Sequence, residues 1–142
     1  MYRDFLELVQ EKNIPYVVAR KGQELACGEL QLKVLSPGDD LKADDQNANS
    51  IVLLASYRGL DILIPGDAEG DVLTTLDLAP VQILKGSHHG SRDPQIKLLL
   101  DQIRPREAII SVGTGNSYGH PVQQTLDAIE AAGARVYRTD LQ

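Results

Sequence analysis

The sequence has one cysteine, no tryptophan and no long apolar run, and what it lacks excludes several kinds of protein. Cys27 has no partner within the chain, so a fold held together by disulfides is excluded, as is a zinc site built from several cysteines. No apolar run approaches the roughly 18 residues that a membrane-spanning helix needs. Residues 1–11 carry several charges and lack the apolar core of a signal peptide.

Basic residues are outnumbered, and the charge is unevenly placed. The net charge is −6. Residues 1–80 hold 7 Lys and Arg against 14 Asp and Glu, whereas residues 81–142 hold 7 against 6. A uniformly basic module for nucleic acids is therefore excluded. The less acidic half contains all three histidines, so a site for an anionic substrate is expected there.

The length of 142 residues predicts one domain, spanning residues 1–142. Apolar spacing and turn signals predict helices at 2–12, 67–76, 96–103 and 121–132, and strands at 16–20, 24–27, 29–35, 50–57, 60–65, 81–85, 107–112 and 135–138. The first half is β-rich, with a hairpin at Arg58-Gly59. The second half alternates strands and helices, which indicates an α/β fold with a helix-covered mixed sheet.

The first candidate site is Pro65-Gly66-Asp67, where a buried-type strand runs into a glycine and a carboxylate. Ligands and metals gather at such strand ends, because side chains there leave the sheet and reach open space. An aspartate can ligate or bridge divalent metals. The alternative, which this feature alone favours, is that Asp67 simply caps the following helix.

The second candidate site is Lys85-Gly86-Ser87-His88-His89-Gly90-Ser91, which follows another apolar strand. Imidazole is the commonest neutral metal ligand. Two histidines on a continuing strand would point to opposite faces, so one would bind metal while the other packs or contacts substrate. Lys85 and Arg92 flank them and could hold phosphate oxygens. The alternative is a polar turn with surface histidines.

The third candidate site is Gly113-Thr114-Gly115-Asn116-Ser117-Tyr118-Gly119-His120-Pro121. Glycines let backbone N–H groups converge on an anion, and a helix is predicted to follow. The spacing is one residue longer than a dinucleotide-binding fingerprint, so that match is weak. An ordinary connecting loop is the alternative. A fourth segment, Asn47-Ala48-Asn49-Ser50, by itself indicates only a turn before a strand.

Together and in this order, the motifs resemble the metallo-β-lactamase-fold domain of the ComEC family, the membrane channel proteins of DNA uptake in natural transformation. The pattern is N-x-N-S before a strand, G-D after the next, then K-x-x-H-H-G-S, N-x-Y-G-H-P and V-Y-R-T-D. It runs from Tyr2 to Asp140. The resemblance implies an αββα sandwich that holds one or two divalent metals, zinc or manganese, and a hydrolase of the nuclease or phosphodiesterase class.

The resemblance also implies roles for individual residues. Its metal ligands are Asp67, as the bridging carboxylate, and one of the pair His88 and His89. Its catalytic and cleft-lining residues are His120, Tyr118 and Lys85, with Asn49, Ser91, Gly113, Gly115 and Asn116 as contacts to substrate. It implies DNA and the rest of the membrane channel protein as partners. It places the chain in a soluble domain of a bacterial plasma-membrane protein, with the extracytoplasmic face favoured.

One departure from the family pattern is large. The family's H-x-H-x-D-H metal motif is missing, since no histidine precedes His88. The chain is therefore expected to be the C-terminal portion of the sandwich, to bind metal weakly and to hydrolyse little by itself. Apolar strands at 50–57 and 60–65 would then lack their covering layer, which predicts a homodimer or strand exchange. The rival readings are a non-catalytic binding domain of this fold and a nucleotide-binding protein that uses the loop at 113–119.

Overall fold

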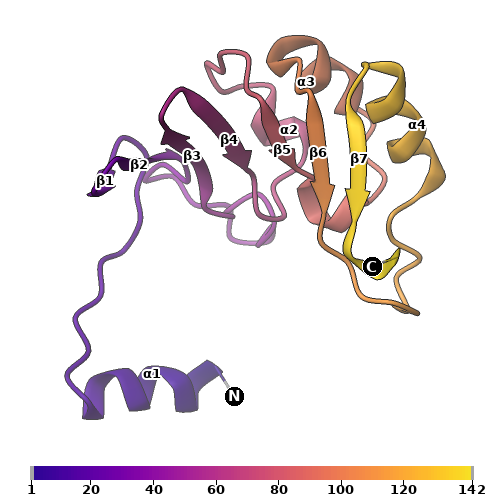
Figure 1. The fold of residues 1–142 in the computed structure, drawn as a ribbon. Coiled ribbons are helices and arrows are strands. Elements are labelled where there is room, and N and C mark those ends of the chain that lie inside the picture. The colour runs from indigo at the N-terminus through magenta and orange to yellow at the C-terminus, as the bar shows by residue number, and fades with distance from the viewer. Residues whose placement is uncertain (1, 142) are drawn as a thin grey trace.

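The computed structural model describes residues 2–141 and shows one mixed sheet with three helices packed on one face (Figure 1). The seven strands are β1 (Glu24–Cys27), β2 (Leu30–Ser36), β3 (Val52–Tyr57), β4 (Leu60–Ile64), β5 (Ile83–Lys85), β6 (Glu107–Ile110) and β7 (Arg135–Arg138). The helices are α1 (Tyr2–Glu11), α2 (Gly70–Leu73), α3 (Ile96–Ile103) and α4 (Gln123–Ala131), with short 3-10 turns η1 (Ser87–Gly90) and η2 (Thr139–Leu141). Within residues 2–141, no helix combines the length and hydropathy needed to cross a bilayer.

The strands lie side by side in sequence order. β1 to β4 are joined by antiparallel pairing, whereas β4 to β7 pair in parallel. The change follows from the connections: a two-residue turn at Arg58-Gly59 joins β3 to β4, and helical crossovers join the later strands. Both turn residues have positive φ, 49° and 81°, as the tightest hairpin turns require. The carboxyl ends of β4, β5 and β6 therefore share one edge of the sheet.

The core lies between the sheet and helices α2, α3 and α4. Leu63 of β4 and Leu84 of β5 pair in register and are fully buried under Leu99 of α3 and Ile129 of α4. α3 places an apolar residue on this face at every third or fourth position, which is the reason the sequence forms a helix there. This packing makes the carboxyl edge of the sheet a rigid support.

The opposite face of the sheet carries apolar side chains that no helix of the described chain covers. Leu53, Ile62, Ile64 and Ile83 are half-buried there, and Ile109 is 40% exposed. Helix α1 lies well away from this face, at the end of an extended segment (Figure 1). Its own apolar side chains are also uncovered, with Phe5 61% and Leu8 47% exposed. Two apolar surfaces are thus left without packing partners.

Most of the predicted elements are confirmed, and the differences have local causes. Residues 16–20 form no strand, because Tyr16 and Val17 extend into solvent without a neighbouring strand to pair with. The helix expected over 67–76 shrinks to the four residues of α2. The strand expected over 81–85 begins only at Ile83, and the strand expected to reach Val112 ends at Ile110.

Candidate functional site

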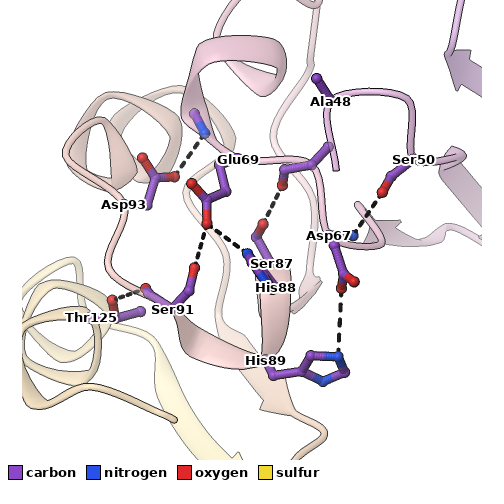
Figure 2. Close-up of polar contacts among 12 residues, drawn as sticks. Ala48, Ser50, Asp67, Glu69, Ser87, His88, His89, Ser91, Asp93 and Thr125 are labelled. Carbon is purple, nitrogen blue, oxygen red and sulfur yellow. Dashed lines mark hydrogen bonds and ion pairs between the residues drawn. The ribbon is translucent and has the colours of Figure 1, made fainter. Parts of the chain in front are cut away.

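Two turns, one after β4 and one after β5, form the centre of the candidate site. The first contains Asp67 and Glu69, and the second contains the two adjacent histidines (Figure 2). Because β4 and β5 are parallel neighbours, their carboxyl ends deliver both turns to the same edge. The predicted convergence of Asp67 with the histidines is confirmed.

The two turns are joined by hydrogen bonds of the backbone as well as the side chains. The Gly66 carbonyl accepts from the His88 N–H at 3.1 Å and from Lys85 Nζ at 3.2 Å. The Ser87 hydroxyl donates to the Ala68 carbonyl. Gly66 has a φ of +62° and lies against Ser50, so a larger residue would strain this turn. The bonds hold the side chains of both turns in fixed relation.

Asp67 faces His89 across a short gap. Asp67 Oδ1 lies 3.6 Å from His89 Nε2 (Figure 2). His89 Nδ1 donates to the Ser111 carbonyl at 2.6 Å, and a carbonyl oxygen can only accept. Neutral His89 therefore presents the lone pair of Nε2 to the carboxylate. The two side chains are 46% and 40% exposed, so a water molecule, a proton or a metal cation can lie between the two acceptors.

The separation of these two atoms suits a metal ion. Two ligand atoms about 2.1 Å from one zinc ion, at an angle of roughly 110–120°, are about 3.4–3.6 Å apart. A histidine whose other nitrogen is fixed by a carbonyl is the usual form of a metal ligand. In residues 2–141, however, no group of three or more His, Cys, Asp or Glu side chains could hold a metal. The described chain offers at most two candidate ligands here, Asp67 and His89.

The alternative role for Asp67 as a helix cap is wrong. Helix α2 begins at Gly70, and its N-cap residue is Glu69, which makes no capping bond. The N–H of Gly70, which has no partner within the helix, donates instead to Oδ2 of Asp93 at 2.8 Å. Asp93 lies in the segment before α3. Asp67 accepts nothing from that helix and is left facing His89. The cap was supplied by a residue distant in sequence, which local pattern does not reveal.

His88 points to a different partner. Its Nδ1 lies 2.8 Å from Glu69 Oε1, and the same oxygen accepts from the Ser91 hydroxyl at 2.6 Å (Figure 2). Glu69 thus fixes the orientation of the His88 ring and leaves Nε2 on its far side. The carboxylate accepts from two donors, of which His88 is partly buried and Ser91 is buried. His88 is held away from Asp67, while His89 faces it.

The histidines do not continue the strand, which corrects the sequence-based expectation. β5 ends at Lys85, and both His88 and His89 adopt left-handed conformations with φ of 42° and 56°. This conformation costs a residue with a Cβ about 1–2 kcal/mol. Strained residues of this kind persist where surrounding contacts determine them, and they cluster at functional sites. The turn still directs the two rings to different partners.

The loop between β6 and α4 brings the third histidine to the site. The rings of His120 and His88 meet edge to face, with centroids 5.6 Å apart. Tyr118 stacks on the outer side of His120 at 6.0 Å. Asn116 closes the loop: Oδ1 accepts from the His120 N–H and Nδ2 donates to the His120 carbonyl. Among the residues described, only His120 Nδ1 is a buried side-chain polar atom without a hydrogen-bond partner.

Lys85 lies on the open face of the sheet beside Asp67. Its Nζ donates to the carbonyl next to that aspartate. Burial lowers the pKa of Lys85 below its ordinary value, and the charge of Asp67 opposes this with a smaller upward effect. A cation thus stands beside the proposed ligand pair, where it can meet a phosphate oxygen.

The remaining predicted residues occupy several positions. Ser91 binds Glu69, and its carbonyl accepts from Thr125. The Asn49 amide is occupied with the backbone of Lys42, and its neighbour Ser50 instead accepts from the Asp67 N–H. Gly113 and Gly115 are exposed in the loop with open space around them.

Sequence reasoning missed Glu69 and the carbonyl of Ser111, and it singled out the segment of Ser50 without assigning that residue a role beside Asp67. Glu69 lies two residues after Asp67, a spacing with no meaning of its own until the turn brings it to His88. A backbone carbonyl has no signal in the sequence at all. Only the fold brings these groups to the histidines.

Comparison with known proteins identifies the relatives of the chain. It is 32% identical over 139 residues to ComE operon protein 3 of Bacillus subtilis, covering 95% of this chain and 18% of that protein. It is 30% identical to Recombination protein 2 of Haemophilus influenzae, covering 78% of this chain and 14% of that protein. The chain is homologous to part of the ComEC competence proteins. No protein-family model matches it.

A third relative agrees with this assignment. The ComEC homologue is 29% identical to Competence protein ComA of Neisseria gonorrhoeae, covering 79% of this chain and 17% of that protein. It therefore spans less than a fifth of the length of these three relatives.

The structural likenesses show the fold alone. A protein from Parabacteroides distasonis designated a metal-dependent hydrolase superposes with a TM-score of 0.63 and 17% identity, over 96% of this chain and 63% of its own. CmlA, a diiron β-hydroxylase from Streptomyces venezuelae, superposes with a TM-score of 0.63 and 13% identity, over 95% of this chain and 35% of its own. They confirm the predicted α/β fold of the metallo-β-lactamase type in this ComEC homologue.

Proposed function

We propose that this chain supplies Asp67 and His89 to the metal centre of a phosphodiesterase or nuclease domain that acts on DNA. The observation that carries the proposal is the 3.6 Å gap between Asp67 Oδ1 and His89 Nε2, with His89 Nδ1 already bound to a carbonyl. A divalent ion between them, zinc or manganese, would neutralise phosphate charge and activate a water molecule.

The surrounding residues would act on the substrate. Lys85 would hold a phosphate oxygen, since its ammonium lies at the same edge as Asp67. His120 would give a proton to the leaving oxygen, and Tyr118 would border the cleft. Glu69 and Ser91 would keep His88 in place. The competence names of the relatives support DNA as the substrate and the rest of a membrane channel protein as the partner.

The isolated chain is expected to bind metal weakly and to hydrolyse little, because catalytic zinc sites have three protein ligands. We further propose that the uncovered sheet face supports a homodimer. The proposed location is a soluble domain of a bacterial plasma-membrane protein, on its extracytoplasmic face.

A titration of the chain with Mn²⁺ tests the ligand assignment, since this paramagnetic ion broadens nearby NMR signals even when binding is weak. Broadening of the His89 ring signals is expected. Asp67→Asn should abolish it, and His89→Gln should abolish the matching broadening of the Asp67 amide signal, whereas His88→Gln and the exposed control Asp71→Asn should retain both. Metal binding that survives Asp67→Asn would overturn the ligand assignment. Tightly held stoichiometric metal with rapid phosphodiester turnover would instead overturn the expectation that the isolated chain binds metal weakly and hydrolyses little.

The main rival is a non-catalytic binding domain with the same fold. It predicts no specific broadening at His89 and equal behaviour of all four variants. The titration therefore separates the two functions without requiring activity from the isolated chain.

A further inference from the structure

The side chain of Tyr118 combines high exposure with a fixed position. It is 81% exposed, more than any other large apolar or aromatic side chain in the described part of the molecule. Its ring nevertheless stacks on His120, with centroids 6.0 Å apart and planes 17° apart. Because the side chain is 81% exposed, the ring face turned away from the imidazole is open to solvent. An aromatic face that is both open and held is a ready stacking surface.

The loop that carries Tyr118 is closed by its own contacts. Asn116 binds both the N–H and the carbonyl of His120, which fixes the turn that contains Tyr118. At the base of the loop, the Val112 N–H and carbonyl both bond to the Thr139 hydroxyl at 2.8 Å. The ring pair is thus preorganised, and binding a ligand would order little further chain.

Edge-to-face ring contacts lead from His120 to the proposed metal ligands. The His120 ring meets His88 at 5.6 Å, and His88 meets His89 at 6.4 Å. His89 in turn faces Asp67. Tyr118 is therefore the first of four neighbouring rings in a row that ends at the carboxylate. A group stacked on Tyr118 and a phosphate at Asp67 would lie at the two ends of this row.

We propose that Tyr118, supported by His120, is a stacking platform for an unpaired nucleobase of the strand whose phosphate meets Asp67 and His89. The inference rests on the proposed function and narrows its substrate to single-stranded nucleic acid. In a duplex each base has both faces covered by its neighbours, whereas an unpaired base offers one to an aromatic ring. The net charge of −6 gives the chain little general attraction for a polyanion, so stacking contributes a large share of its affinity.

Binding of two labelled oligonucleotides of equal length, oligo(dT) and an abasic strand, tests the platform by fluorescence anisotropy. EDTA is present, so the result does not depend on the metal ligands. Tyr118→Ala should weaken oligo(dT) binding by roughly tenfold or more and leave abasic binding unchanged. The control Tyr16→Ala, at a tyrosine that is 71% exposed, should change neither. Equal losses on both strands, no loss, or no binding by the unaltered chain would overturn the proposal.

A second variant gives a spectroscopic readout. The sequence has no tryptophan, so Tyr118→Trp creates the sole indole of the chain. Stacking should quench its fluorescence with oligo(dT), and the abasic strand should not. Quenching by both strands would contradict base stacking. If the Mn²⁺ titration fails while oligo(dT) quenches the indole, the metal assignment is wrong and the stacking platform stands. If the Mn²⁺ titration succeeds while oligo(dT) causes no quenching, only the stacking platform is wrong.

Discussion

Glu69 is a single side chain on which two groups of the site depend. One of its oxygens accepts hydrogen bonds from His88 and from Ser91. His88 is partly buried and Ser91 is buried, so solvent replaces the carboxylate incompletely when it is removed. The orientation of His88 is thus decided by a residue outside the sequence motifs.

Replacing Glu69 tests this dependence. Glu69→Ala should lower the free energy of unfolding by about 1–3 kcal/mol, because two donors lose their acceptor. Glu69→Gln should lose less, since its amide oxygen still accepts. Urea denaturation measures both, with Glu130→Ala, at an exposed position of helix α4, as the control. Equal stability of the Glu69→Ala and Glu130→Ala variants would contradict the role given to Glu69.

Lys85 gives a pH-dependent prediction. Asp67→Asn should lower the pKa of Lys85 further, because it removes the charge that opposes the effect of burial. Between the folded and unfolded pKa values the unfolded chain binds more protons, so stability rises with pH there, and the variant widens that window. An NMR titration of the lysine side chain measures the pKa. Asp71→Asn, whose carboxylate pairs with Lys42, is the control, and an unchanged or higher pKa in Asp67→Asn would refute the coupling.

At the scale of elements, the sequence predicted what depends on local pattern. The hairpin at Arg58-Gly59 and helix Ile96–Ile103 were readable because turn residues and apolar spacing determine them. The turn at His88 and His89 was not, since its left-handed backbone is set by contacts with Gly66 and Glu69, which are distant in the sequence. The parallel strands predicted that the candidate residues converge. They did not predict that Asp67 faces His89 and that Glu69 binds His88.

Two glycines separate backbone strain from crowding at the site. Gly90 and Gly133 have nearly equal φ, +82° and +85°. A Cβ on Gly90 would lie 2.6 Å from Pro121 Cβ, whereas one on Gly133 would meet nothing within 4 Å. Gly133→Ala should therefore cost about 1–2 kcal/mol of stability, and Gly90→Ala a further 1–3 kcal/mol. Urea denaturation measures the difference. Equal losses of stability in the two variants would show that the loop before α4 shifts without cost to admit the Cβ at position 90.

At the scale of the whole molecule, two uncovered apolar surfaces predict self-association. The open sheet face, with Ile109 40% exposed, is expected to pack against a second copy. Light scattering should give a mass that rises with concentration above 15.5 kDa. Ile109→Glu should shift the mass toward the monomer, whereas Leu98→Glu, at a helix residue 61% exposed, should not. A constant monomer mass for the unaltered chain would defeat this expectation.

The left-handed backbone at His88 and His89 lowers the stability of the fold, while the proposed site requires the imidazole side chains at these positions. Glycine adopts such a backbone without penalty, so glycine at position 88 or 89 would relieve conformational energy that histidine must bear. A library of variants selected only for resistance to denaturation would favour glycine at these positions and would discard the imidazoles. Engineering this chain for robustness therefore requires that both histidines be held fixed while stability is sought elsewhere, in the core beneath the sheet.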